Sequence, residues 1–181
     1  MLLLLLFAAA GLQAQCNGPV SSINENFNAI GYGQRPSCWN GFYNAVPSYT
    51  ANYCYNGEYW IQRTNSGTTL AEHFMIVLPQ STMKGPLSFD LRKLPNSGNL
   101  TLEVGSLSDP NDLRTFTLMR ALSYGSSTAQ RFTVDFTTYN GTDKYIALRA
   151  YLLPSQGFAF DNLTWSGPLP VVTPALPPKG F

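Results

Sequence analysis

The chain has 181 residues, which suits one domain with tails, and 44% of them are hydrophobic, enough to build a core. Its 11 basic and 10 acidic residues leave a formal net charge of +1 without a Lys/Arg cluster, which excludes a basic nucleic-acid-binding or acidic-lipid-binding surface. Only 12% of residues are charged, while Ser, Thr, Asn and Gly are frequent, a composition typical of extracellular β-domains with polar turns.

The N-terminus predicts export. Residues 2–11 form an apolar run, and Leu12-Gln-Ala-Gln15 follows as a cleavage site, so residues 1–15 are expected to be a signal peptide. The run is too short to span a bilayer, and no membrane span is expected. The predicted location is secreted, extracellular or cell-surface. Lipidation of Cys16 ranks second, because Gln15 stands where lipoprotein signals carry a small residue.

From residue 40 onward, short runs of alternating polar and apolar residues are separated by Gly, Pro, Asn and Ser turns. The runs predict strands over residues 59–64, 71–78, 87–92, 100–104, 115–122, 132–137, 145–153 and 157–165. Residues 71–78 become continuously apolar, as expected of a mid-sheet strand covered on both faces. No helix is expected. Nine or so strands at this spacing predict an all-β fold, a two-sheet antiparallel β-sandwich of jelly-roll type.

The C-terminal residues differ in composition. Five prolines lie between residues 168 and 178, and such a segment cannot extend a sheet. We therefore expect a domain over residues 16–167, followed by a Pro-rich linker over 168–181 that leads to a neighbouring module of a longer polypeptide.

Residues 49–60 carry five aromatic rings. Tyr55, Tyr59 and Trp60 surround an Asn56-Gly57 turn, where exposed rings would stack on a sugar and form a ligand-binding site. The alternative is that these rings form cross-strand aromatic pairs within the sheet.

The chain has three cysteines. Compartment and spacing predict a disulfide between Cys38 and Cys54, which leaves Cys16 unpaired. Zinc is not expected, because there is no CxxC spacing and the single histidine, His73, has no nearby partner.

Several segments, taken in order, carry a resemblance: Glu25-Asn-Phe27, Pro36-Ser-Cys38-Trp39, Leu87-Ser-Phe89-Asp90, residues 102–110, Val134-Asp135-Phe136, residues 145–149 and Phe160-Asp161-Asn162. Over residues 24–165 the chain resembles the choice-of-anchor J and cleaved-adhesin group, relatives of the MAM domains. These are jelly-roll modules of secreted and cell-surface bacterial proteins. The resemblance implies a non-catalytic adhesion or carbohydrate-binding module whose partner is a glycan or an extracellular protein surface.

An enzyme is not expected. His73 lies in the most apolar strand, and Asp90, Glu103 and Asp135 occupy polar positions of alternating strands that favour solvated side chains over a catalytic pair. GxSxG and HExxH motifs are both missing from the sequence. The alternatives are an appendage or part of a secreted hydrolase, a peptidase or glycosidase, and a structural spacer.

A structural calcium site is predicted at Glu25 and Asp161. The first and last strands of a jelly roll commonly lie side by side; Glu25 is expected to open the first strand, and Asp161 interrupts the apolar run of the last. Two carboxylates brought together there would favour a hard cation. The resemblance implies such a calcium. The alternative is that Glu25 pairs with a base such as Arg149 while Asp161 accepts hydrogen bonds from a turn.

Overall fold

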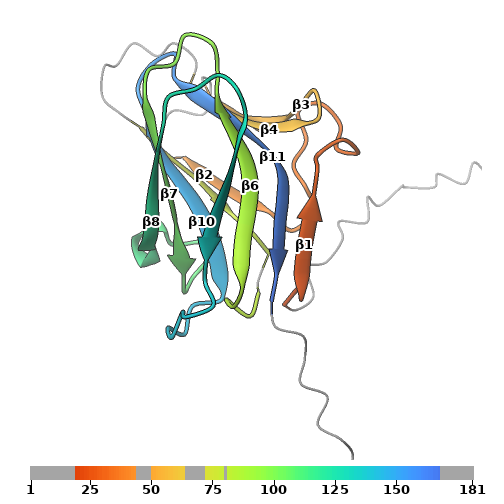
Figure 1. Cartoon of the computed structure of the whole chain (residues 1–181), viewed down its shortest axis with the longest axis vertical. Coiled ribbons are helices and arrows are strands. Elements are labelled where there is room, and N and C mark those ends of the chain that lie inside the picture. Colours follow the sequence, from red (N-terminus) through yellow and green to blue (C-terminus); the bar gives the residue numbers. More distant parts are fainter. Residues whose placement is uncertain (1–18, 44–49, 64–71, 80, 168–181) are drawn as a thin grey trace, which may run out of the picture.

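Strands with alternating side chains build two antiparallel sheets packed face to face (Figure 1). The computed structural model describes residues 19–43, 50–63, 72–79 and 81–167. The elements are β1 (Ser22–Glu25), β2 (Asn40–Tyr43), β3 (Thr50–Tyr55), β4 (Glu58–Arg63), β5 (Glu72–Val77), β6 (Pro86–Lys93), β7 (Leu100–Leu107), the 3-10 turn η2 (Leu113–Thr115), β8 (Thr117–Tyr124), β9 (Gln130–Asp135), β10 (Tyr145–Leu152) and β11 (Gly157–Ser166).

One sheet has six strands and the other five. The order in the six-stranded sheet is β3-β4-β11-β6-β9, and β1 joins it by pairing with the second half of β11. The five-stranded sheet runs β2-β5-β10-β7-β8. All these pairings are antiparallel, which confirms the predicted jelly-roll sandwich.

Each of the eight predicted strands is present, with shifts of a few residues at the ends. The mid-sheet position predicted for residues 71–78 is also confirmed, because β5 lies between β2 and β10. The sequence patterns missed β2 and β3 and misplaced the first strand. That strand, β1, ends at Glu25 rather than opening there.

The core between the sheets is rich in aromatic rings. Phe27 lies 5.5–5.7 Å, centroid to centroid, from the rings of Trp39, Tyr59 and Phe160. Trp39 is 8% exposed and belongs to this core. Such edge-to-face and tilted pairs add roughly 0.5–1.5 kcal/mol each beyond the burial of their area.

A second apolar cluster lies on the outer side of the five-stranded sheet. Met75, Val77, Leu107 and Ala147 form its buried floor. The segment around η2 crosses over this floor, and Leu113 and Phe116 from that segment, together with Tyr145 of β10, pack against it. Burial on both faces explains why β5 is continuously apolar.

The predicted signal peptide, Cys16 and the Pro-rich linker lie outside the described residues. Within the described part of the chain, no helix is long and apolar enough to cross a membrane.

Candidate functional site

The hairpin of β3 and β4 places its aromatic rings on the two opposite faces of the sheet. Asn56 and Gly57 form its turn with φ of 55° and 78°, the left-handed pair that a two-residue type I′ turn requires. The register sets Tyr53 opposite Trp60 and Cys54 opposite Tyr59. Since successive side chains of a strand point to opposite faces, Tyr59 and Trp60 cannot belong to one surface.

Tyr59 faces the core, so its prediction as a ligand-binding residue is wrong. Its side chain is 0% exposed and stacks on Phe160 at 5.1 Å. Burial raises the pKa of the Tyr59 phenol well above its usual range. The ring contributes to the core instead of to a binding surface.

Tyr55 and Trp60 do lie together on the outer face, and two further tyrosines join them. Tyr55 meets Trp60 edge to face at 4.8 Å, and Tyr32 lies 5.8 Å from Tyr55 and 5.2 Å from Tyr53. We call Tyr32, Tyr53, Tyr55 and Trp60 the aromatic surface. Tyr32 is 73% exposed and Tyr55 42%, so rings are accessible to a ligand.

The sequence analysis missed Tyr32 because it lies 21 residues before Tyr53 and outside the hairpin. Two backbone hydrogen bonds bring its loop to β3: Gly33 N donates to Cys54 O at 3.2 Å, and Cys54 N donates to Gln34 O at 2.9 Å. A hydrogen bond between the Tyr32 and Tyr53 side chains is the largest cause that raises the pKa of Tyr53. Glycines on both sides of Tyr32 were the sole local sign of a turn there.

Polar groups flank the aromatic surface. Trp60 Nε1 donates to Glu58 Oε2 at 3.0 Å, and Arg92 of β6 donates to both oxygens of Glu58, with Nε at 2.7 Å from Oε1. The Arg92 guanidinium also lies 5.3 Å from the centroid of Trp60. The hydrogen bonds to Glu58 raise the pKa of Arg92. This bidentate pair fixes the indole and offers charged hydrogen-bonding groups beside the rings.

The predicted calcium ligands lie in neighbouring strands but not in one site. β1 pairs with β11, as expected of first and last strands, yet Glu25 stands opposite the inward-facing Leu163, whereas Asp161 stands opposite Asp90 on the outer face. The β-bulge between Asp161 and Thr164 shifts the alternation of side chains along β11, and Glu25 and Asp161 therefore lie on opposite sides of the sheet. No group of three or more metal-ligating side chains occurs among the described residues. Calcium binding itself stays a prediction, without these two residues as shared ligands.

The alternative prediction was that Asp161 accepts hydrogen bonds from a turn while Glu25 pairs with Arg149. It is correct for Asp161 and wrong for the pairing of Glu25 with Arg149. Asp161 Oδ1 accepts from the Asn162 backbone N–H at 2.6 Å, and Glu25 Oε1 accepts from Phe27 N at 2.7 Å. Arg149 Nε instead donates to Glu103 Oε2 at 2.7 Å in the other sheet. Burial is the main cause that raises the pKa of Asp161, with Glu58 and Asp90 adding to it.

The predicted bridge between Cys38 and Cys54 is wrong. Cys54 is a free, buried thiol, which points inward from β3 toward Tyr59. Cys38 is disulfide-bonded. Burial, with a smaller effect of Glu25, raises the pKa of the Cys54 thiol to about 12, which makes it a packing residue.

The remaining candidates do not assemble a catalytic pair. Glu103 lies in β7 of the five-stranded sheet, while Asp90 and Asp135 lie in β6 and β9 of the six-stranded one. Asp135 Oδ1 accepts from Thr137 N at 2.8 Å, and the side-chain and backbone hydrogen bonds from Thr137 lower its pKa. His73 lies in β5 opposite Tyr151.

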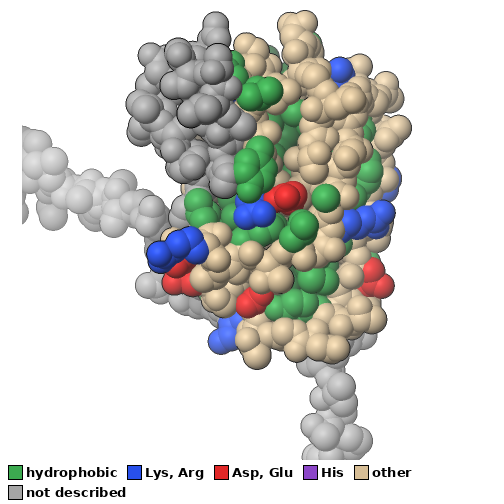
Figure 2. All heavy atoms as spheres, turned by 90° about the vertical axis from the view of Figure 1, so that its left-hand side faces the viewer, with side chains coloured by type: hydrophobic (Ala, Val, Ile, Leu, Met, Phe, Trp, Pro, Cys, Tyr) green, Lys and Arg blue, Asp and Glu red, His purple; other side chains and the backbone are tan. Residues whose placement is uncertain are grey.

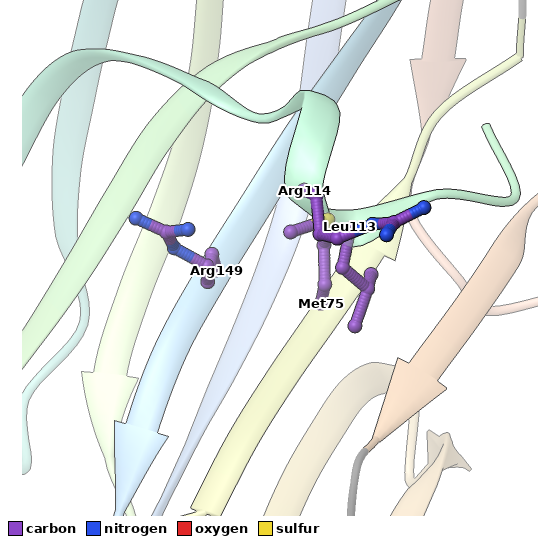
Figure 3. Close-up of a pocket in the computed structure, with 4 residues that line it drawn as sticks. All are labelled: Met75, Leu113, Arg114 and Arg149. Carbon is purple, nitrogen blue, oxygen red and sulfur yellow. The ribbon is translucent and has the colours of Figure 1, made fainter. Parts of the chain in front are cut away.

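The outer face of the five-stranded sheet is a second candidate surface, on which hydrophobic side chains lie between scattered charges (Figure 2). A hollow of about 240 Å³ is lined by Met75, Leu113, Arg114 and Arg149. Figure 3 shows Met75 beside Leu113, with both guanidinium groups pointing away from them. The Arg149 guanidinium lies 3.9 Å from the centroid of Phe116, so that ring is already covered.

Comparison with known proteins finds the fold among adhesin domains and carbohydrate-binding modules. No protein-family model and no curated protein matches the chain. The K1 cleaved adhesin domain of Lys-gingipain from Porphyromonas gingivalis superposes with a TM-score of 0.63 at 17% identity, over 82% of this chain and 99% of that domain. The K3 domain gives 0.60 at 15% identity over 78% and 96% of the two chains.

A family 29 carbohydrate-binding module superposes with a TM-score of 0.53 at 13% identity, over 81% of this chain and 90% of that module. At such identities the likeness shows a shared fold. The fold expected from the resemblance to cleaved adhesins is therefore confirmed, while membership of the choice-of-anchor J group stays a prediction.

Proposed function

We propose that this chain is a secreted, non-catalytic module that binds glycans through the aromatic surface and so attaches its parent polypeptide to a glycan-bearing surface. The observation that carries the proposal is a row of four rings on one outer sheet face, each in contact with the next, of which Tyr32 is 73% and Tyr55 42% exposed. Large exposed groups of rings are rare on a soluble domain unless they bind something.

The chemistry of the surface suits a sugar. Aromatic rings contact the apolar C–H faces of a pyranose, while Glu58 and Arg92 beside them provide an acceptor and donors for its hydroxyls. The shared fold with adhesin domains and carbohydrate-binding modules supports a binding role, as does the predicted signal peptide. We further propose membership of the choice-of-anchor J group and a neighbouring module beyond the Pro-rich tail.

A glycan array followed by calorimetry tests the proposal. Trp60→Ala and Tyr32→Ala should each lower the affinity for the bound glycan by about tenfold or more, since central aromatic anchors dominate such contacts. Tyr151→Ala is the matched control, because Tyr151 is 42% exposed, like Tyr55, but lies on the other sheet. Equal losses in Trp60→Ala and Tyr151→Ala, or no glycan bound by the wild type, would contradict the proposal.

A further inference from the structure

The outer face of the six-stranded sheet also carries a groove of short polar side chains. Ser22, Asn24, Ser88, Thr164 and Ser166, from three strands, line a hollow of about 270 Å³ together with the apolar residues Ile23, Pro86 and Trp165. The register places Asn24 opposite Thr164, Thr164 opposite Ser88 and Ser22 opposite Ser166. We call these five residues the hydroxyl groove.

The hydroxyl groove and the aromatic surface lie on the same face. Leu87 and Trp165 are buried, so by alternation their neighbours Ser88 and Thr164 point outward. Arg92, which caps Trp60, is also an outward residue of β6. Four residues separate Arg92 from Ser88 along this strand, a distance of about 13 Å at about 3.3 Å per residue.

A β-bulge lies between the aromatic surface and the hydroxyl groove. The register of β11 against β6 shifts between Asp161 and Thr164, and Asn162 has φ of 48°. Asn162 Nδ2 donates to Asp90 Oδ2 at 2.8 Å, and Arg131 Nη1 donates to Asn162 O at 2.8 Å. Bulges of this kind redirect side chains next to binding sites. Here the bulge presents carboxylates and an amide midway between the aromatic surface and the hydroxyl groove.

The groove suits a neutral, hydroxyl-rich ligand. Its serine and threonine hydroxyls and the Asn24 amide both donate and accept hydrogen bonds, as sugar hydroxyls do. Its lining residues carry no charge, and Arg131 reaches its edge, where Nη2 donates to Thr164 Oγ1 at 3.0 Å. Arg131 and Arg92, the cations beside the groove and the rings, are already paired with Asp90 and Glu58, so neither is left to attract an anionic chain.

We infer that the aromatic surface and the hydroxyl groove are the two ends of one site, which holds an extended neutral oligosaccharide along β6 and β11. The inference rests on the proposed glycan-binding function and adds the length and charge of the ligand to it. A single sugar cannot reach both ends, because they lie about 13 Å apart along the strand. A chain of several sugars reaches both.

The test measures calorimetric affinities for cello-, manno-, xylo- and chito-oligosaccharides of increasing length, with oligogalacturonate as the anionic counterpart. Affinity should rise by about tenfold or more from disaccharide to hexasaccharide, as added hydrogen bonds in the groove contribute. Asn24→Ala and the blocking variant Ser88→Tyr should abolish this gain and leave disaccharide binding unchanged. Thr101→Tyr, at an exposed position of β7 in the other sheet, is the control.

The outcomes separate this inference from the proposed function. If disaccharides bind as tightly as hexasaccharides, if both groove variants keep the gain, or if oligogalacturonate binds best, the extended neutral site is refuted while glycan binding stands. If none of the probes binds, the proposed function fails with it. Thermal melting of each variant distinguishes a blocked groove from a misfolded domain.

Discussion

Replacing Tyr59 by Ala tests the division of the hairpin into a core face and a binding face. Tyr59 is 0% exposed and lies 5.1 Å from Phe160 and 5.6 Å from Phe27. Truncation of a buried aromatic side chain removes its transfer free energy and leaves a cavity, at a loss of about 3–5 kcal/mol. That is a large share of the roughly 5–15 kcal/mol that stabilises a typical domain.

Urea unfolding followed by tryptophan fluorescence gives the free energy, and a thermal scan checks it. For a domain of this size the loss corresponds to a fall in melting temperature of roughly 6–20 °C. The matched variant is Tyr55→Ala, from a ring in the same hairpin that is 42% exposed. It gives up its contacts with Tyr32 and Trp60, at a loss of about 1 kcal/mol.

Similar losses of stability in Tyr59→Ala and Tyr55→Ala would refute the assignment of Tyr59 to the core. The same holds if Tyr59→Ala folds with wild-type stability and loses glycan binding, because Tyr59 would then be a surface residue. Tyr59 and Tyr55, two residues of one hairpin, thus test directly which of its rings face the core and which face solvent.

Two further predictions concern the same hairpin. The Cys54 thiol should resist iodoacetamide at pH 8 in the native protein and react after unfolding. The pKa of the Cys54 thiol is raised to about 12 in the folded protein, while an unfolded thiol titrates near 8.5. The stability that the protonated thiol contributes is therefore complete below about pH 8.5 and is lost as the pH rises toward 12. Urea melts of the wild type and Cys54→Ala over a pH series measure this loss, and an equal pH dependence in both proteins contradicts it. Gly57→Ala should lower stability by about 1–2 kcal/mol, since φ there is 78° and a Cβ would lie 2.5 Å from Asn28 Oδ1; unchanged urea melts would show that the turn is not strained.

Most of the strands could be predicted from the sequence, because a strand with one face in the core must alternate apolar and polar side chains. β6, with its alternating burial from Pro86 to Lys93, is the clearest example. β2 and β3 escaped this reasoning, since their sequences, NGFY and TANYCY, lack clean alternation.

The candidate site was predicted in part, and its errors share one cause. A turn between Tyr55 and Trp60 was identified from Asn56-Gly57, but the side of the sheet to which each ring points depends on strand register. Register also places Cys54 inside the sandwich, and a β-bulge that shifts the register of β11 separates Asp161 from Glu25. Tyr32 joins the rings through a tertiary contact of its loop, which local sequence does not encode.

That loop contact also bears on how the aromatic surface would bind. The loop carrying Tyr32 is held to β3 by hydrogen bonds to the backbone N–H and C=O of Cys54, and the Cys54 side chain is buried. On the other side, Glu58 and Arg92 lock the Trp60 indole. Rings held by the scaffold before a ligand arrives lose little conformational freedom on binding, and the ordering free energy that opposes association is correspondingly small. The aromatic surface can therefore bind a glycan without prior rearrangement of its rings.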